Sequence, residues 1–210
     1  QGNMDVINGT SYGRGVEQVM YDMALKDPVG MACMQTRFDF CCKRSEQALK
    51  AAKGKIDIFF IGDDYGTQNG LLVSPDMWRE LFFDKLKAMC DLGHSYGAKV
   101  MLHSCGSTSV IWDQLIEAGV DIYDTVQPEA KDMDPVMLKE KFGDKISFHG
   151  TISTQKTLPF GSPEDVKKEV HQRIAAVGKN GGFIVAPAHN IQPDTPLENI
   201  LAMYRAVKED

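Results

Sequence analysis

Short apolar runs alternate with longer amphipathic runs along most of this sequence, and this alternation limits the possible folds more than any other feature. The apolar runs lack the two-residue period of a half-exposed strand, so they are typical of strands buried on both faces of a parallel sheet. The runs predicted as strands are residues 57–61, 99–103, 121–124, 146–149 and 182–186. Strict strand–helix alternation predicts an α/β fold, either a (β/α)8 barrel or an open doubly wound sheet.

Three of the intervening segments carry a clear helix start. Ser74, Ser162 and Thr195 are each followed directly by proline, and an acidic residue lies in the first turn after it. A hydroxyl side chain caps the free N–H groups of a helix, and proline suits the first helical position. These starts place helices between the predicted strands.

Polar and reactive residues gather after the ends of the predicted strands. They are Asp63, Asp64, His103, Cys105, Asp124, Gln127, His149 and His189. A barrel enzyme builds its active site from the loops at the carboxyl ends of successive strands, whereas an open sheet concentrates it at one switch point. The sequence has no Gly-x-Gly-x-x-Gly or Walker-type loop to support a nucleotide-binding open sheet. The barrel is therefore the favoured fold.

The strand count falls short of a complete barrel. Residues 4–8 are a candidate for one further strand, which makes about six βα units where a barrel needs eight. Gln1 is not an initiator methionine, so we expect the chain to begin inside a longer protein. The expected fold is an incomplete (β/α)8 TIM-type barrel. Its open strand edges favour association, so a homodimer is expected.

Composition narrows the class of protein. The net charge of −6 argues against a nucleic-acid partner. No run is long enough to span a membrane, and no signal peptide is visible. The five cysteines include the adjacent pair Cys41-Cys42, which does not suit a disulfide framework. These features predict a cytoplasmic enzyme that acts on a small-molecule substrate.

His103 and Cys105 form the most informative short motif. Residues two apart on a strand point to the same side, so the imidazole and the thiol converge at the end of the run 99–103. Zinc favours nitrogen and sulfur ligands of this kind. A buried strand cysteine can also be a plain core residue, and that reading is the alternative.

The other candidate residues have a functional and a structural interpretation each. Asp63 and Asp64 are candidates for acid/base catalysis, or for capping a nearby helix. Gln127 and His149 are candidate substrate contacts, with turn formation or structural hydrogen bonding as the alternative. Two further candidate substrate contacts are assigned to a glycine-bracketed turn, at Tyr12 and Arg14.

With these observations together, the chain resembles the uroporphyrinogen decarboxylase superfamily, which includes cobalamin-dependent methyltransferases. The resemblance covers nearly the whole chain. It lies in residues 13–18, 63–68 with Ser74-Pro75, Phe148-His149-Gly150 and, most specifically, 181–199. It implies that residues 1–210 are the C-terminal portion of a single barrel domain whose first two strands are absent. It also implies a tetrapyrrole at the mouth of the barrel.

The branches of this superfamily differ in chemistry. The methyltransferase resemblance implies zinc held by His103, Cys105 and a third ligand at the position of His189, where that branch usually has cysteine. It implies methyl transfer between a corrinoid protein and a thiol, and this is the favoured function. The decarboxylase resemblance implies a cofactor-free enzyme acting on porphyrinogen acetate side chains, and His189 also matches a histidine of that branch. A non-catalytic module that binds a corrinoid protein is the remaining alternative.

Overall fold

The computed structural model describes residues 4–209, which divide into two compact units. The first unit contains the residues up to 65 together with 73–104 and 111–121. The second contains residues 66–72, 105–110 and those from 122 onward. The elements are, in chain order, α1 (Val6–Arg14), α2 (Val16–Leu25), α3 (Pro28–Ala52), β1 (Ile58–Gly62), α4 (Pro75–Trp78), a π-helical turn (Arg79–Phe83), α5 (Asp84–Ser95), β2 (Lys99–His103), a 3-10 turn (Ser109–Ile111), α6 (Trp112–Ala118), β3 (Ile122–Val126), α7 (Pro135–Phe142), β4 (Ser147–Ile152), α8 (Thr157–Phe160), α9 (Pro163–Val177), β5 (Phe183–Pro187) and α10 (Leu197–Glu209).

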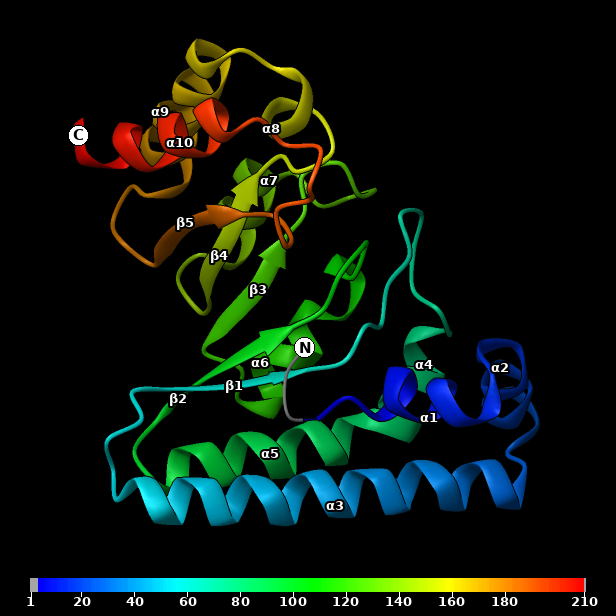
Figure 1. The fold of residues 1–210 in the computed structure, drawn as a ribbon. Helices are drawn as coiled ribbons and strands as arrows, with labels where there is room; N and C mark the ends of the chain where they lie inside the picture. Colours follow the sequence, from blue (N-terminus) through cyan, green and yellow to red (C-terminus); the bar gives the residue numbers. More distant parts are fainter. Residues whose placement is uncertain (1–3, 210) are drawn as a thin grey trace. The chain divides into compact units, whose positions relative to one another are not determined.

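In the first unit, β1 and β2 pair in parallel, with Gly62 opposite His103 at their carboxyl ends. The helices α3 and α5 lie side by side along these strands (Figure 1). Gly93 of α5 allows the close approach, because a Cβ atom there would lie 2.8 Å from both Phe59 and Val100. The strand side chains under α5 are buried, and the close packing on them holds β1 and β2, with their carboxyl ends, in place.

The prediction of a strand at residues 4–8 is wrong. Residues from Val6 onward form α1, so Tyr12 and Arg14 lie on a helix and not in a turn. The cause is a long-range contact: the Asp63 carboxylate accepts hydrogen bonds from the backbone N–H groups of Val6 and Ile7. These are among the N–H groups that a helix start leaves unpaired, and their satisfaction favours the helix.

In the second unit, β3 pairs with β4 and β4 with β5, all in parallel. The helices α9 and α10 pack on each other, and α9 contacts both β4 and β5 (Figure 1). A buried apolar cluster joins these elements. Its members are Ile152, Leu158, Val166, Val170, Ala202, Met203 and Ala206. The cluster holds the carboxyl end of β4 against the helical layer.

Most elements expected from the sequence are present. The five predicted strands are all observed, and their ends differ from the predicted ones by at most three residues. Ser74 caps α4 and Ser162 caps α9, as predicted, and α10 begins two residues after Thr195. Cys33, Cys41, Cys42 and Cys90 are free thiols and belong to α3 or α5.

The predicted α/β class with parallel strands is confirmed. Within each unit, neighbouring strands follow in chain order, β1–β2 in the first and β3–β4–β5 in the second, as in a barrel and without the reversal of order that marks a doubly wound sheet. Between residues 4 and 209 no helix combines the length and the apolar character needed to cross a membrane.

Candidate metal site at the strand ends

The side chain of Asp63, the residue after β1, stabilises the first turn of α1. Its side chain is almost fully buried, and its two carboxylate oxygens accept the N–H groups of Val6 and Ile7 at 2.9–3.0 Å. Burial raises the pKa of Asp63 to about 7, against the opposing effect of these backbone N–H donors. The predicted alternative role of Asp63, capping a nearby helix, accounts for these contacts. Its catalytic role stays a prediction.

Asp64 points in a different direction and lies beside His103. Its Oδ1 is 3.7 Å from His103 Nε2, while its Oδ2 accepts a hydrogen bond of 2.9 Å from the Asn8 side chain. Both side chains are partly exposed, at 25% and 14%. One of the two adjacent aspartates therefore serves the fold, and the other reaches the strand-end histidine.

His103 is held rigidly at the end of β2. Its carbonyl accepts the N–H of Asp63, and its ring lies edge-on to Phe60, with centroids 6.1 Å apart. The next residue, Ser104, is buried and accepts the backbone N–H of Tyr65 through its hydroxyl. A side chain fixed by its neighbours in this way is suited to ligation or catalysis.

Cys105 completes a group of three potential metal ligands. One ligand atom from each of Asp64, His103 and Cys105 lies within 4.8 Å of the others. Cys105 is the first residue of the second unit, but only Ser104 separates it from His103 in the chain, so their proximity is a local property. Ligand atoms on a tetrahedral zinc are about 3–4 Å apart, which a small side-chain adjustment here would give.

Gln127, a predicted substrate contact, supports the loop that follows Cys105. The side chain is buried, and its amide oxygen accepts the N–H of Gly106 at 3.1 Å. Gly106 has a φ of +80°, and a Cβ atom there would lie 2.5 Å from the carbonyl oxygen of Thr67. Only glycine suits this turn.

His149 is paired with Asp124 on the neighbouring strand. The two residues are opposite each other in the β3–β4 register, and His149 Nδ1 lies 2.6 Å from Asp124 Oδ1. The Asp124 side chain is only 11% exposed and that of His149 is 26% exposed. The carboxylate orients the ring, and the partly exposed imidazole can contact a substrate.

The other predicted site residues are on α1 and after β5. Tyr12 is 79% exposed on α1. The Arg14 guanidinium forms two hydrogen bonds, of 2.6 and 2.8 Å, with the Asp22 carboxylate. His189 is an exposed residue just beyond β5 in the second unit. Their roles in binding substrate or metal stay predictions.

Sequence reasoning missed two features of this region. The sequence predicts an acid/base or capping role for Asp64 and does not predict that it is a metal ligand beside His103. It also does not predict the pairing of Asp124 with His149, although both lie near the ends of consecutive predicted strands. That shared position is the signal that could have paired them, because consecutive parallel strands place equivalent residues side by side.

Comparisons with known proteins agree on one family. A family model described as uroporphyrinogen decarboxylase (URO-D) matches residues 6–210. The chain is 30% identical to methylcobamide:CoM methyltransferase MtaA of Methanosarcina barkeri, over 73% of this chain and 42% of that protein. It is 26% identical to a uroporphyrinogen decarboxylase of Magnetococcus marinus, over 70% of this chain and 40% of that protein.

A solved structure supports the fold over nearly the whole chain. A methyltransferase from Methanosarcina mazei matches with a TM-score of 0.74 and 22% identity, over 98% of this chain and 56% of that one. The chain thus spans about two fifths of the length of the curated relatives and just over half of the solved neighbour. The observed strand order together with this likeness corresponds to part of a TIM-type barrel.

Proposed function

Because this chain belongs to the uroporphyrinogen decarboxylase family, we propose that it is part of a zinc-dependent methyltransferase. The reaction moves a methyl group between a corrinoid carried by a partner protein and a thiol-type acceptor. The observation that carries the proposal is the group formed by Asp64, His103 and Cys105 at the ends of β1 and β2.

The donor set fits zinc. It offers one imidazole nitrogen, one sulfur and one carboxylate oxygen, all three of which are established zinc ligands. Three protein ligands also leave a position for a substrate, which distinguishes catalytic from structural zinc sites. When bound, zinc would supply the positive charge that ionises a substrate thiol near neutral pH.

The surrounding residues hold this site in a fixed geometry. Asn8 anchors one oxygen of Asp64, so the other oxygen stays directed at His103. The edge contact with Phe60 limits rotation of the His103 ring. We assign to His149 a contact with the substrate, since Asp124 fixes its Nδ1 and the side chain is partly exposed.

His189 is proposed as a further ligand. It lies after the last strand, β5, and its imidazole would be the third ligand in place of the carboxylate of Asp64. If His189 is the third ligand, His189→Ala should lose zinc, and if Asp64 is, Asp64→Ala should lose it. The metal analysis described below distinguishes the two.

Names of the relatives support the choice of reaction. One relative is a methylcobamide:CoM methyltransferase, and a second, 30% identical over 77% of this chain and 40% of its own length, is a methylated-thiol–coenzyme M methyltransferase of Methanosarcina mazei. We infer from them a corrinoid protein as partner and a small thiol as acceptor. We also propose a homodimer acting in the cytoplasm, as the sequence predicts.

Metal analysis of the purified protein tests the proposal. We expect one zinc per chain in the wild type, and loss of most of it in Cys105→Ala and His103→Ala. Cys42→Ala and His171→Ala are matched controls on the helices α3 and α9, and they should keep the metal. His189→Ala and Asp64→Ala then show which of the two is the third ligand.

Two results would contradict this function. Absence of zinc from the wild type, together with decarboxylation of a porphyrinogen, would assign the protein to the decarboxylase branch, from which it also has relatives. Corrinoid-protein binding without zinc or methyl transfer would identify a binding module. Stoichiometric zinc with thiol-dependent demethylation of a methylcorrinoid would support the proposal.

A further inference from the structure

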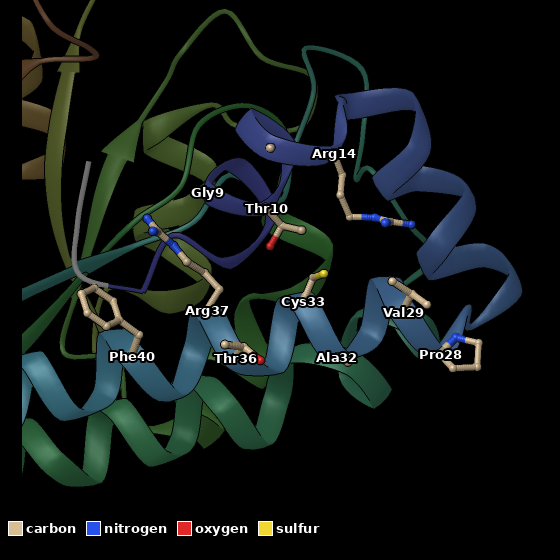
Figure 2. Close-up of a pocket in the computed structure, with 11 residues that line it drawn as sticks. Gly9, Thr10, Arg14, Pro28, Val29, Ala32, Cys33, Thr36, Arg37 and Phe40 are labelled. Atoms are coloured by element: carbon tan, nitrogen blue, oxygen red, sulfur yellow. The ribbon is translucent and has the colours of Figure 1, made fainter.

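A cavity of about 790 Å³ lies between α1 and the first half of α3, inside the first unit. Figure 2 shows that α1 forms one wall and α3 the other. This volume is within the range of small-molecule sites in proteins, about 300–1,000 Å³. The cavity involves none of the residues of the proposed metal site.

Small residues line both walls of this cavity without closing it. Gly9 and Gly13 face it from α1, and Ala32 and Cys33 face it from α3. A Cβ atom added at Gly13 would have no heavy atom within 4 Å. Helices with such small side chains can pack closely, yet the space between these two stays open, and we call it the slot.

The Thr10 hydroxyl is an unused polar group on the cavity wall. Thr10 is 7% exposed, and its Oγ1 has no hydrogen-bond partner. A helical threonine can bond to the carbonyl of the preceding turn, as the neighbouring Ser11 does to Ile7. In Figure 2 the Thr10 hydroxyl points toward α3. A buried hydroxyl without a partner is costly, and a ligand atom would satisfy it.

The charged side chains that line the slot are all positive. Arg14 and Arg37 are among the lining residues, which include no acidic side chain. Arg37 lies against Gly9, and both of its hydrogen bonds go to Asp5, so the remaining guanidinium N–H groups are available. Apolar side chains stand at its two ends, with Pro28 and Val29 at the start of α3 and Phe40 further along the same helix.

We propose that this slot binds a flat aromatic carboxylate. The ring system lies between the small-residue walls and against Phe40, while the carboxylate accepts hydrogen bonds from Thr10 and Arg37. Arginine matches the planar geometry of a carboxylate and also stacks on aromatic rings. The proposal is independent of the methyltransferase function, since no residue of the proposed metal site lines the slot and the test measures binding alone.

Titration calorimetry with 2-naphthoate tests the proposal on the purified protein. We expect one site per chain, about tenfold weaker binding in Thr10→Val and in Arg37→Met, and loss of binding in Ala32→Phe. Ala51→Phe is the matched control, because it places the same side chain at an exposed position of the same helix. It should bind as the wild type does, and circular dichroism confirms that each variant is folded.

Several outcomes would overturn the proposal. Wild-type protein that does not bind 2-naphthoate excludes this ligand class, and equal affinity in Ala32→Phe excludes this cavity. Equal affinity for the uncharged 2-naphthamide excludes recognition of the carboxylate. Suppose that the wild type does not bind 2-naphthoate and forms a dimer that Ala32→Phe dissociates. The slot would then be a contact between two copies of the chain. The conservative Thr10→Val variant decides the matter if Ala32→Phe does not fold.

Discussion

Asp124 and His149 face each other across two neighbouring strands, with 2.6 Å between the Asp124 Oδ1 and the His149 Nδ1. The carboxylate is largely buried and the imidazole is partly exposed. A buried carboxylate beside one ring nitrogen selects the form of histidine that carries a proton there. The other ring nitrogen is then left to contact a substrate.

The first prediction concerns the proton position on His149. We expect a neutral His149 to carry its proton on Nδ1, and Asp124→Ala to shift the population toward the Nε2 form. Two-dimensional 1H–15N NMR of the ring nitrogens distinguishes the two forms. Asp121→Ala is the control, because Asp121 pairs with His94 at 2.7 Å and should alter that ring alone. An unchanged His149 spectrum in Asp124→Ala would show that the pair does not set the form.

The buried Asp63 should make stability depend on pH in the direction opposite to most carboxylates. Its pKa rises from 3.8 to about 7 in the folded protein, mainly through burial. The folded state therefore binds this proton more tightly than the unfolded chain. The resulting stabilisation is complete below about pH 4 and is lost as the pH rises through about 7, with a total on the order of 4 kcal/mol.

Urea unfolding of wild type and Asp63→Asn, between about pH 4.5 and about pH 8, measures this contribution. The free energy of unfolding of the wild type minus that of the variant should fall as the pH rises. Other carboxylates titrate equally in both proteins and cancel. A difference that grows with pH would mean that the N–H donors of α1 outweigh burial and keep Asp63 ionised.

Two glycines on neighbouring helices should respond oppositely to the same substitution. At Gly30 an added Cβ would lie 2.2 Å from the Asp22 side chain, which is fully buried. Gly30→Ala should therefore destabilise the protein by about 1–3 kcal/mol. Gly13→Ala meets no atom within 4 Å and should stabilise α1 by about 0.5–1 kcal/mol. Chemical denaturation of both variants checks the signs. A Gly30→Ala variant at least as stable as the wild type would contradict the close packing at Gly30.

Loss of the α9 cap should lower the free energy of unfolding moderately. The Ser162 hydroxyl accepts the backbone N–H of Asp165, and the Asp165 side chain accepts the N–H of Ser162 in return. Ser162→Ala should cost about 1 kcal/mol, or about 2–4 °C in Tm. Ser162→Gly should cost only a few tenths of a kcal/mol. Thermal unfolding compares them, and an alanine variant as stable as wild type would show that the cap contributes nothing.

Local patterns predicted much of this fold. The runs at 99–103 and 182–186 are strands within one residue of their predicted ends, and the helix starts at Ser74 and Ser162 are where their Ser-Pro pairs placed them. Burial on both faces requires a continuous apolar run, and a cap requires a specific side chain beside the helix end. Such signals are contained in a few neighbouring residues, so a sequence displays them directly.

Other features depend on contacts between residues far apart in the chain. Residues 4–8 have strand-like composition, yet α1 begins at Val6 because Asp63, more than fifty positions away, accepts hydrogen bonds from the first N–H groups of the helix. Likewise, no local pattern distinguishes Asp63 from Asp64, although one is buried under α1 and the other faces His103.

Local sequence is enough to predict the α/β class, the strands, the helix caps and the His-x-Cys pair, because each is set by side chains within one turn or one strand. Only the folded structure shows the separate tasks of Asp63 and Asp64, the pairing of Asp124 with His149 and the helix that begins at Val6. Those outcomes depend on which donors and charges surround a side chain after folding. Distance in space, and not order in the chain, sets that environment.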